Sequence, residues 1–485
     1  VDGGWTGMTH PEELGGQNLP YSLGSVMAEW FSSANHSWAM YPGLSQGCME
    51  TLKEHGTSEQ QKMFLNNLIG GQWTGTMCLT EPHCGSDLGM LKCKAVKNDD
   101  GTYSLTGTKI FISAGEHDMS DNIVHIVIAR LPDAPSGTKG ISLFVVPKFN
   151  AGTEGEKLDR NAVTCGSIEH KMGIKGSATC VINFDEAKGY LVGTENRGLN
   201  CMFTFMNTAR IGTGLEGLSA SEAAFQGALA YAKDRLQFRA MTGVKNPDGP
   251  ADPIINHPDV RRMLLTQKAF AEGNRALAIY AMKLVDISQA NQDEAAKQLA
   301  ESKLALLTPI VKAFLTETAQ ETTSYGMQVF GGHGFIKEWG MEQLARDTRI
   351  CTMYEGTTGI QAIDLLARKV VGSNGKLLDV FTNEVKEYCK SIRDKTQFNA
   401  WSNSIDKHVH EWHQITEDIM QRAAKNPAEL GAASVDYLMY SGYVVVGYFW
   451  LQMAVVAQQK LDEGTNDPEF YKQNYIRLNF ILTVY

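Results

Sequence analysis

The chain has 485 residues, of which 43% are hydrophobic and 20% are charged, and its net charge is −10. This is the composition of a globular protein with room for several packed domains. A protein whose main partner is a nucleic acid is expected to be basic, so the acidic charge balance argues against that class.

The first part of the chain is predicted to be helical. Residues 22–70 carry a helical pattern, and they lie between glycine pairs at 15–16 and 70–71. The first residue is Val1, and residues 1–16 read like the interior of a domain, so we expect the natural protein to begin earlier. Residues 1–72 are therefore predicted to be an N-terminal helical domain that is truncated here.

The pattern changes to β-structure at residue 73. Residues 92–97 and 103–113 flank the turn-forming residues 98–101, which predicts a hairpin. The apolar runs at 123–131, 141–147 and 180–184 add further strands between Gly, Pro and Asp loops. Short strands at this spacing favour a small barrel or sandwich, and residues 73–197 are predicted to form a central β-barrel domain.

The helical period returns after residue 198. Four long helices are predicted at 199–238, 258–290, 293–330 and 342–371, with a Pro-, Gly- and Asn-rich loop at 241–257. Short connections between long helices are typical of a bundle, here residues 198–372. Residues 373–485 are predicted to be an appended helical domain, so the expected fold class is α+β.

The chain shows no obvious membrane span or disulfide framework. No apolar run reaches the ~20 residues of a span, and residues 442–456 come nearest. The nine cysteines form no CxxC pair, which favours reduced thiols in a cytosol-like compartment. We predict no metal site: His408, His410 and His413 have helical spacing, and a solvated helix face is the favoured interpretation.

Three glycines interrupt the helix predicted at 199–238. Gly212, Gly214 and Gly217 each lower helix stability by about 1 kcal/mol relative to Ala. Their grouping predicts the close approach of another helix or of a ligand, and the pattern alone does not choose between them.

Glu355 is the most informative carboxylate in the sequence. It lies between an apolar run and Gly356, and a helical pattern begins after Thr357, a plausible N-cap. A carboxylate at this place suits proton abstraction next to a carbonyl, because its own backbone N–H can serve as an oxyanion donor. A carboxylate that only complements the helix dipole is the competing interpretation.

Five separated segments, in order, resemble signatures of the acyl-CoA dehydrogenase family. Residues 79–87 (LTEPHCGSD) resemble its TEPxxGSD motif, residues 109–113 (KIFIS) its flavin-side strand, and residues 171–179 its KMGxRxSxT motif. Residues 328–335 (QVFGGHGF) and 354–357 (YEGT) follow at the family's spacing. Residues 80–89, 184–193 and 359–369, with the helical appendage, resemble the longer bacterial members, a group that includes dehydrogenases of 3-(methylthio)propanoyl-CoA.

The resemblance implies FAD-dependent α,β-desaturation of an acyl-CoA thioester. Glu355 matches the family's base, which removes the α-proton while hydride leaves for flavin N5, and Arg210 matches a residue that tunes the base. Some relatives carry the base just before that arginine, but Ala209 cannot serve as a base here. The positions that match FAD contacts are Thr80, Phe111, Ser113, Arg235, Phe238, Gln328, Gly331, Gly332 and Thr357, and those that match substrate contacts are Ser86 and Gly356.

The sequence departs from the family pattern at three positions. Cys84 stands where relatives have small residues, Gln343 replaces a Lys or Arg, and Arg239 replaces the Gly after R-x-x-F. None of them is expected to touch the chemistry.

The resemblance also implies partners and rivals. Arg235 and Phe238 match residues that reach FAD from a neighbouring subunit, so a homodimer or a dimer of dimers is expected. Electron-transfer flavoprotein is the implied electron acceptor. The substrate remains open between 3-(methylthio)propanoyl-CoA of dimethylsulfoniopropionate catabolism and fatty acyl-CoAs from short to long. The rival functions are an acyl-CoA oxidase and a flavin-bearing DNA-binding relative, the latter disfavoured by Glu355 and the acidic charge.

Overall fold

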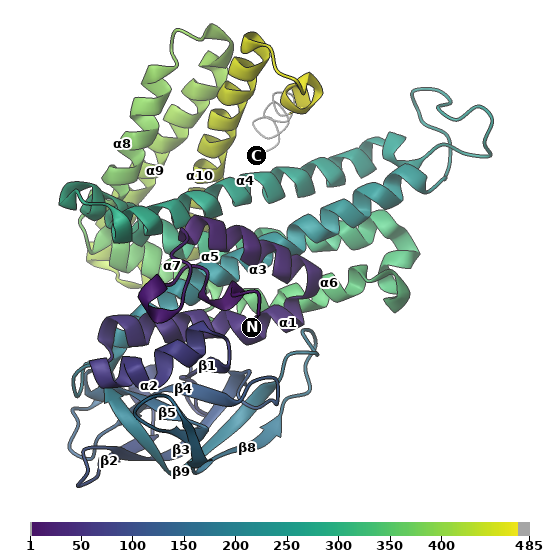
Figure 1. The fold of residues 1–485 in the computed structure, drawn as a ribbon. Coiled ribbons are helices and arrows are strands. Elements are labelled where there is room, and N and C mark those ends of the chain that lie inside the picture. Colours follow the sequence, from purple (N-terminus) through teal and green to yellow (C-terminus); the bar gives the residue numbers. More distant parts are fainter. Residues whose placement is uncertain (1, 474–485) are drawn as a thin grey trace. The chain divides into compact units, whose positions relative to one another are not determined.

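The computed structural model of the protein describes residues 2–473 and divides into two compact units, residues 1–212 and 213–485. The first unit combines helices and a β-sheet, and the second is helical (Figure 1). The four-domain division expected from the sequence stays a prediction. Helix predictions for residues 474–485 lie outside the described part of the chain.

Two helices cover the sheet of the first unit. They are α1 (Tyr21–His55) and α2 (Ser58–Ile69), as predicted, preceded by the short 3-10 turns η1 (Trp5–Gly7) and η2 (Glu12–Leu14). Helix α1 is kinked at Asn35, where φ is −160° and ψ is 92°. A capping box starts α2, because the Thr57 side chain accepts from the Gln60 N–H and the Gln60 side chain accepts from the Thr57 N–H.

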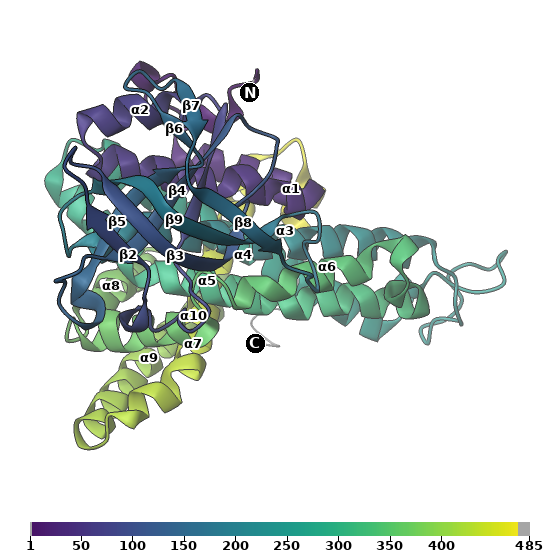
Figure 2. The same ribbon diagram turned by 90° about the horizontal axis from the view of Figure 1, so that it is seen from below.

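The strands of the first unit close into a barrel. They are β1 (Trp73–Cys78), β2 (Lys94–Lys97), β3 (Tyr103–Ser113), β4 (Asn122–Arg130), β5 (Ile141–Pro147), β6 (Phe149–Ala151), β7 (Lys157–Arg160), β8 (Val163–Ile168) and β9 (Thr179–Val192). Neighbours pair in the order β4, β5, β9, β3 and β2, and Lys94 of β2 pairs with Arg130 of β4 to complete the ring. Strand β1 extends the sheet beside β4. Strand β8 pairs with β9, and β6 and β7 form a separate hairpin (Figure 2). The predicted hairpin and the barrel are confirmed.

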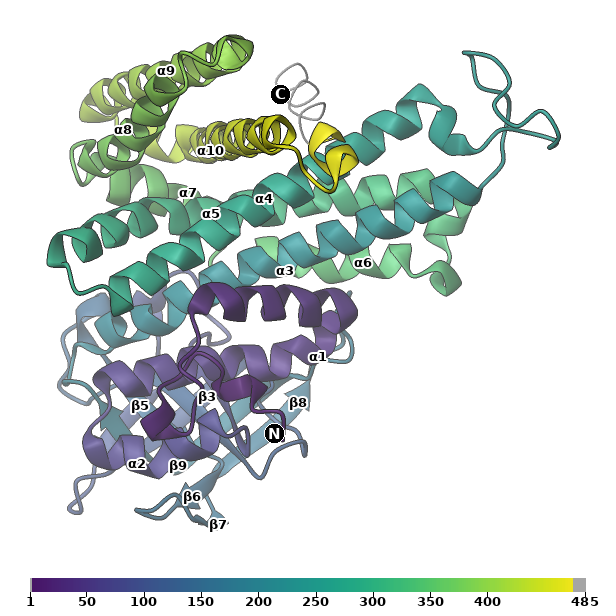
Figure 3. The same cartoon turned by 45° about the horizontal axis from the view of Figure 1, so that its top comes forward.

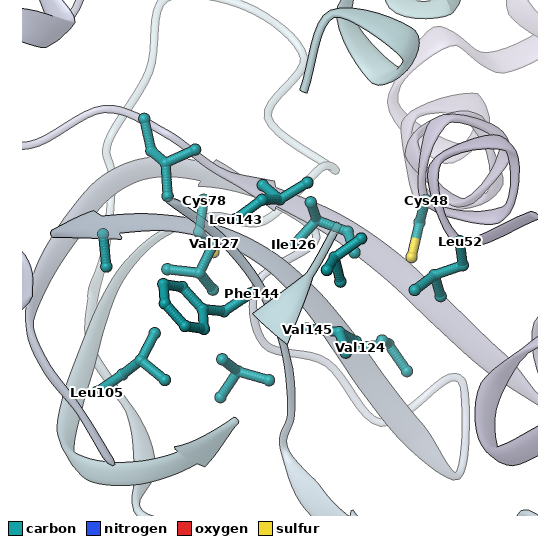
Figure 4. Close-up of a cluster of buried hydrophobic side chains, with 14 of the residues drawn as sticks. Cys48, Leu52, Cys78, Leu105, Val124, Ile126, Val127, Leu143, Phe144 and Val145 are labelled. Atoms are coloured by element: carbon teal, nitrogen blue, oxygen red, sulfur yellow. The ribbon is translucent and has the colours of Figure 1, made fainter. Parts of the chain in front are cut away.

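The core of the first unit explains why the sequences of β4 and β5 are mainly apolar and do not alternate between apolar and polar residues. Strand β5 is buried along its whole length and β4 along all but its last residue. Side chains from β4 and β5 fill the barrel on one face and meet Cys48 and Leu52 of α1 on the other (Figure 4). A strand that is buried on both faces loses the alternation of a half-exposed strand.

His125 is a titratable group inside this core. It lies on β4 with no exposed surface, and its Nδ1 shares a hydrogen bond of 2.7 Å with the Thr76 hydroxyl. Its ring meets Phe184 edge to face. Burial, together with the cations Lys148 and Arg160, lowers the pKa of His125 to about 3. The imidazole of His125 is therefore neutral in the folded protein at neutral and mildly acidic pH.

We expect His125 to make folding sensitive to mild acid. The pKa is lowered on folding, so below about 6.5 the unfolded chain binds a proton that the folded chain excludes, and stability falls as pH falls. Between pH 6.5 and 5 this proton binding should lower the free energy of unfolding by about 2 kcal/mol. Urea unfolding at pH 7.5 and 5.0 should show that extra loss in the wild type and not in His125→Gln. An equal loss in both proteins would contradict the prediction, because carboxylates contribute equally to both.

The second unit is built on long helices. They are the C-terminal part of α3 (Gly198–Asp234), α4 (Pro258–Ala290), α5 (Glu294–Phe330), α6 (Met341–Thr348) and α7 (Thr358–Ile363), the last continued by a π-helical stretch at Asp364–Val371. In this unit α3, α4, α5 and α6 lie side by side, and the loop between α3 and α4 projects from one end (Figure 3). The helices predicted at 199–238, 258–290 and 293–330 are confirmed, although α3 ends at Asp234.

The prediction of one long helix at residues 342–371 is wrong. Helix α6 gives way to a 3-10 turn at Arg349–Thr352, and α7 begins only at Thr358. The interruption is caused by left-handed backbone at Glu355, with φ of 54°, and Gly356, with φ of 90°. Helical periodicity continues on both sides of the interruption, so it could not reveal the break.

The glycines of α3 are explained in part by helix packing. A Cβ on Gly214 would lie 2.8 Å from Cγ1 of Val311, and a Cβ on Gly217 would lie 3.0 Å from the carbonyl oxygen of Leu315, both on α5. Gly212 has open space at this position. At Gly214 and Gly217 the close approach is therefore that of another helix.

The appended helices are α8 (Lys376–Ser391), α9 (Asn399–Lys425) and α10 (Ala428–Glu463), which stand beside one another. Glu384 of α8 joins them to the bundle, since it accepts from the hydroxyls of Tyr280 on α4 and Tyr448 on α10 and from the ammonium of Lys303 on α5. The predicted helical appendage is confirmed for the described residues.

Among residues 2–473, α10 has the length and apolar composition that would let a helix cross a membrane. Within its most apolar stretch, 67% is buried in the structure, and the core helix of a water-soluble protein meets the same criterion. Helix α10 lies against α4, α5, α7 and α9.

Candidate active site

Glu355 lies on a strained turn immediately before a helix. Its left-handed φ costs a residue other than glycine about 1–3 kcal/mol, and such strain is found most often at functional sites. The Thr357 hydroxyl oxygen accepts from the N–H of Ile360 at 3.3 Å, so the predicted N-cap of α7 is confirmed. Glu355 is half-buried, and Gly356 follows it into the same turn.

Buried side chains hold the two carbonyl groups of this turn. Lys312 of α5 donates to the Gly356 carbonyl at 2.7 Å, and the Gln361 side chain donates to the Glu355 carbonyl at 2.9 Å. Nearby, the Tyr354 hydroxyl donates to the carboxylate of Glu216 on α3. Burial, followed by the neighbouring Cys351 thiol and Glu216 carboxylate, raises the pKa of Tyr354 well above its usual value, so it stays a hydrogen-bond donor.

Arg210, the expected tuning residue, is buried, with 4% of its surface exposed. It belongs to the first unit, whereas Glu355 belongs to the second. The predicted action of Arg210 on Glu355 therefore stays a prediction.

The flavin-side motifs come together in the first unit. The N–H of Ile110 on β3 donates to the Thr80 carbonyl at 2.9 Å, and Ser113 at the end of β3 pairs with Thr179 of β9. Thr80, Phe111 and Ser113 thus lie on one strand and the segment beside it. Ser86 lies in the same 79–87 segment, with an exposed side chain.

Phe111 is turned outward by an irregularity in β3. The register between β3 and β9 shifts between Lys109 and Ile112, and Phe111 takes a φ of 60°. Phe111 is 59% exposed, whereas the next residue of the strand, Ile112, is buried. Such bulges redirect a side chain, and here they present an aromatic face beside Thr80 and Ser113.

A buried ion pair supports this segment and was missed by the sequence reasoning. The Lys109 ammonium has no exposed surface and donates to Glu81 at 2.9 Å and to the Leu79 carbonyl at 3.0 Å. Glu81 also accepts from the N–H groups of Lys92 at 2.7 Å and Cys93 at 3.0 Å. Burial raises the pKa of Glu81, but Lys109 and these donors outweigh burial and lower it. The acid of the TEPxxGSD motif therefore fixes the fold of the segment.

Arg235 and Phe238 lie on a loop that presents them to solvent. The loop is closed by hydrogen bonds from Ile254 to the Arg235 carbonyl and from Asp252 to the Phe238 carbonyl. Phe238 has a φ of 57° and is 76% exposed. The Ala240 N–H, other backbone donors and Arg239 lower the pKa of the enclosed Asp252 carboxylate to about 2. Arg239, which stands where the family has Gly, thus has a structural role as a partner of Asp252.

Gln328, Gly331 and Gly332 lie near the same end of the second unit. Helix α5 ends at Phe330, and Phe330 belongs to an apolar cluster that includes Ile254 from the end of the 235–253 loop. Gly331 has a φ of 59°, and a Cβ on Gly331 or Gly332 would meet nothing within 4 Å. The glycine backbone is therefore exposed and open to a ligand.

Lys312 and Gln361 were also missed by the sequence reasoning. The signal for Lys312 was available, because it is a lone charge within the apolar run at 304–315. Such a lysine is expected to be buried with a specific partner.

The predicted helix face at His408, His410 and His413 is only partly correct. His408 contacts Glu411, His410 contacts Gln414, and His413 shares a hydrogen bond with Thr382 of α8. The three side chains therefore take separate partners. His83 of the 79–87 segment lies 3.6 Å from the carboxylate of Glu81.

Family models match nearly the whole chain. The acyl-CoA dehydrogenase N-terminal domain matches residues 1–72, the middle domain 76–187 and the C-terminal domain 196–370, and an acetyl-CoA dehydrogenase C-terminal-like model matches 381–481. The chain belongs to the acyl-CoA dehydrogenase family. This confirms the resemblance drawn from the motifs.

Comparisons with individual proteins also place the chain in the acyl-CoA dehydrogenase family. The chain is 44% identical to 3-methylmercaptopropionyl-CoA dehydrogenase of Ruegeria pomeroyi, over 97% of this chain and 79% of that protein. It is 36% identical to the broad-specificity linear acyl-CoA dehydrogenase FadE5 of Mycobacterium tuberculosis, over the same shares. The solved acyl-CoA dehydrogenase of Bacillus anthracis, complexed with FAD, shares the fold with a TM-score of 0.79 and 22% identity, covering 99% of this chain and 78% of that one.

Proposed function

We propose that this acyl-CoA dehydrogenase desaturates an acyl-CoA thioester between its α- and β-carbons, with Glu355 as the base. The observation that carries the proposal is the position of Glu355 on a strained turn before α7, with its carbonyl and that of Gly356 held by buried donors. A carboxylate fixed in this way can take a proton from carbon without reorganising. The 44% identity to a relative that acts on an acyl-CoA supports the same chemistry.

FAD fits the residues that match the family's cofactor contacts. Thr80 and Ser113 offer hydroxyl groups beside the exposed ring of Phe111, and the open backbone of Gly331 and Gly332 can approach a phosphate. The residues that would hold the cofactor in this way are Thr80, Phe111, Ser113, Arg235, Phe238, Gln328, Gly331, Gly332 and Thr357. When bound, FAD supplies the acceptor for the hydride from the β-carbon.

The protein's own residues carry the proton chemistry. Glu355 accepts the α-proton on its carboxylate, and its backbone N–H donates to the thioester oxygen, where charge develops as the proton leaves. Arg210 is proposed to tune the carboxylate, and Ser86 and Gly356 to contact the acyl-CoA.

The substrate that the comparisons favour is 3-(methylthio)propanoyl-CoA. The Ruegeria pomeroyi relative is named for this thioester, and its identity to this chain is higher than that of the FadE5 relative. Short- to long-chain fatty acyl-CoAs remain the second candidate. We further propose a homodimer or dimer of dimers, electron-transfer flavoprotein as the electron acceptor and a place in the bacterial cytoplasm.

A substrate screen tests this proposal. The FAD-loaded protein is mixed with 3-(methylthio)propanoyl-CoA, butanoyl-CoA, octanoyl-CoA and palmitoyl-CoA, and the loss of flavin absorbance is followed without oxygen. We expect the sulfur-containing thioester to bleach the flavin with a kcat/KM at least about tenfold above that of palmitoyl-CoA, a difference of about 1.4 kcal/mol in transition-state binding. Bleaching by no thioester would overturn the proposal.

The same assay separates the rival functions. Reoxidation of the reduced protein by oxygen as fast as by electron-transfer flavoprotein would identify an oxidase. A protein that carries FAD, is bleached by no acyl-CoA and binds duplex DNA would be the DNA-binding relative.

A further inference from the structure

Lys312 is a charged group in the interior of the second unit. It lies in the middle of α5, has no exposed surface and donates to the Gly356 carbonyl at 2.7 Å. Removing an ammonium group from water is unfavourable unless partners compensate for the lost hydration. The compensation here comes from the turn that bears the proposed base and from carboxylates around it.

The charged and titratable groups that face Lys312 come from four segments. They are Glu216 on α3, Glu317 on α5, Cys351 in the 3-10 turn and Glu355 on the strained turn. Burial lowers the pKa of Lys312 to about 8, although these groups act to raise it. Lys312 is therefore mainly protonated at pH 7, as a cation among three carboxylates.

Gln361 completes the contact with the turn. It is fully buried on α7 and donates to the Glu355 carbonyl at 2.9 Å. Two successive carbonyl groups, both on residues with left-handed φ, thus accept hydrogen bonds from two buried side chains on different helices. A strained turn persists only where surrounding contacts fix it, and these two donors supply such contacts.

We propose that Lys312 and Gln361 are positioning residues that fix the Glu355 turn, and that Lys312, unlike Gln361, also contributes a positive charge next to the base. This inference rests on the proposed function of Glu355. The two residues do the same mechanical task through one carbonyl each, but only Lys312 carries charge. Their variants must therefore differ in one measurable respect.

The test compares Lys312→Met and Gln361→Leu as FAD-loaded proteins. Both substitutions keep the approximate volume and remove the donor, so both should lower kcat about 10- to 100-fold, the range expected for a small misplacement of a catalytic group. In Lys312→Met the acidic limb of the pH–kcat/KM profile should also move to higher pH by about one unit, since a carboxylate that loses a nearby cation ionises less readily. In Gln361→Leu the limb should stay where it is.

Lys303→Met is the matched control. Lys303 lies on the same helix and pairs with Glu384, away from the turn. It should leave kcat and the acidic limb unchanged. Lys312→Leu, which also removes both the charge and the donor, replaces Lys312→Met if the methionine variant does not fold. An unshifted limb in the Lys312 variant, or the same shift in Gln361→Leu, would overturn the inference.

A second readout does not depend on activity. Backbone hydrogen exchange of the peptide spanning residues 353–361 should be at least about tenfold faster in both variants than in the wild type and in Lys303→Met, because a turn that loses a fixing contact opens more often. Unchanged exchange would overturn the positioning role. If the wild type bleaches with no acyl-CoA, the proposed function fails, while the exchange data still decide whether the two residues fix the turn.

Discussion

Glu355→Gln is expected to lower turnover by at least about a thousandfold while FAD stays bound. Glutamine keeps the shape of the side chain but cannot accept a proton at neutral pH, and general-base catalysis contributes about 10²–10⁴-fold. Apart from Thr357, whose side chain this variant leaves unchanged, the residues proposed to hold FAD lie outside the turn, so the flavin content and its absorbance should match those of the wild type. The measurement is anaerobic flavin bleaching with the best substrate of the screen.

Glu338→Gln is the control for this experiment, because Glu338 is an exposed carboxylate of the same unit. It should leave turnover unchanged. Glu355→Gln with more than about a tenth of wild-type activity would remove Glu355 from the role of base. Loss of activity together with loss of FAD would point to a structural role for Glu355.

Of the substitutions proposed here, one that breaks the ion pair between Lys109 and Glu81 is expected to lower the free energy of unfolding the most. Lys109→Met leaves the carboxylate of Glu81, with only 3% of its surface exposed, without its cation. Removing one partner of a buried pair costs about 3–5 kcal/mol in the free energy of unfolding. Urea unfolding at pH 7.5 would measure it, and Thr80 and Ser113 should lose their fixed positions, so FAD binding should weaken as well.

Two further variants separate the ion pair from general damage to the core. Adding Glu81→Gln to Lys109→Met removes the unpaired charge but keeps an oxygen for the N–H groups of Lys92 and Cys93, so it should recover part of the loss. Lys62→Met breaks an exposed pair with Glu154 and should cost less than about 1 kcal/mol. Equal losses for Lys109→Met and Lys62→Met would contradict this account.

Much of the fold could be predicted because its signals are local. Strands β4 and β5 are continuous apolar runs, and α4 and α5 begin and end within a residue of their predicted bounds. The N-cap at Thr357 required only a hydroxyl before a helical pattern. Family membership could also be predicted, because the sequence contains short motifs that resemble those of the family and follow in the same order.

The contacts between distant residues could not be predicted. Nothing in the sequence joins Lys109 to Glu81 across 28 positions, or Lys312 to Gly356 across 44, because such pairs depend on which elements pack together. The outward turn of Phe111 depends on a register shift between two strands. The break in the helix predicted at 342–371 depends on a backbone conformation that surrounding hydrogen bonds maintain.

The sequence by itself determined the family, the order of helical and β-structured segments and the identity of the carboxylate that we propose as the base. Only the tertiary structure decided how that carboxylate is held, because left-handed backbone at a glutamate is unfavourable in an isolated segment. The turn is stable only where α5 and α7 bring a buried ammonium and a buried amide to its carbonyl groups.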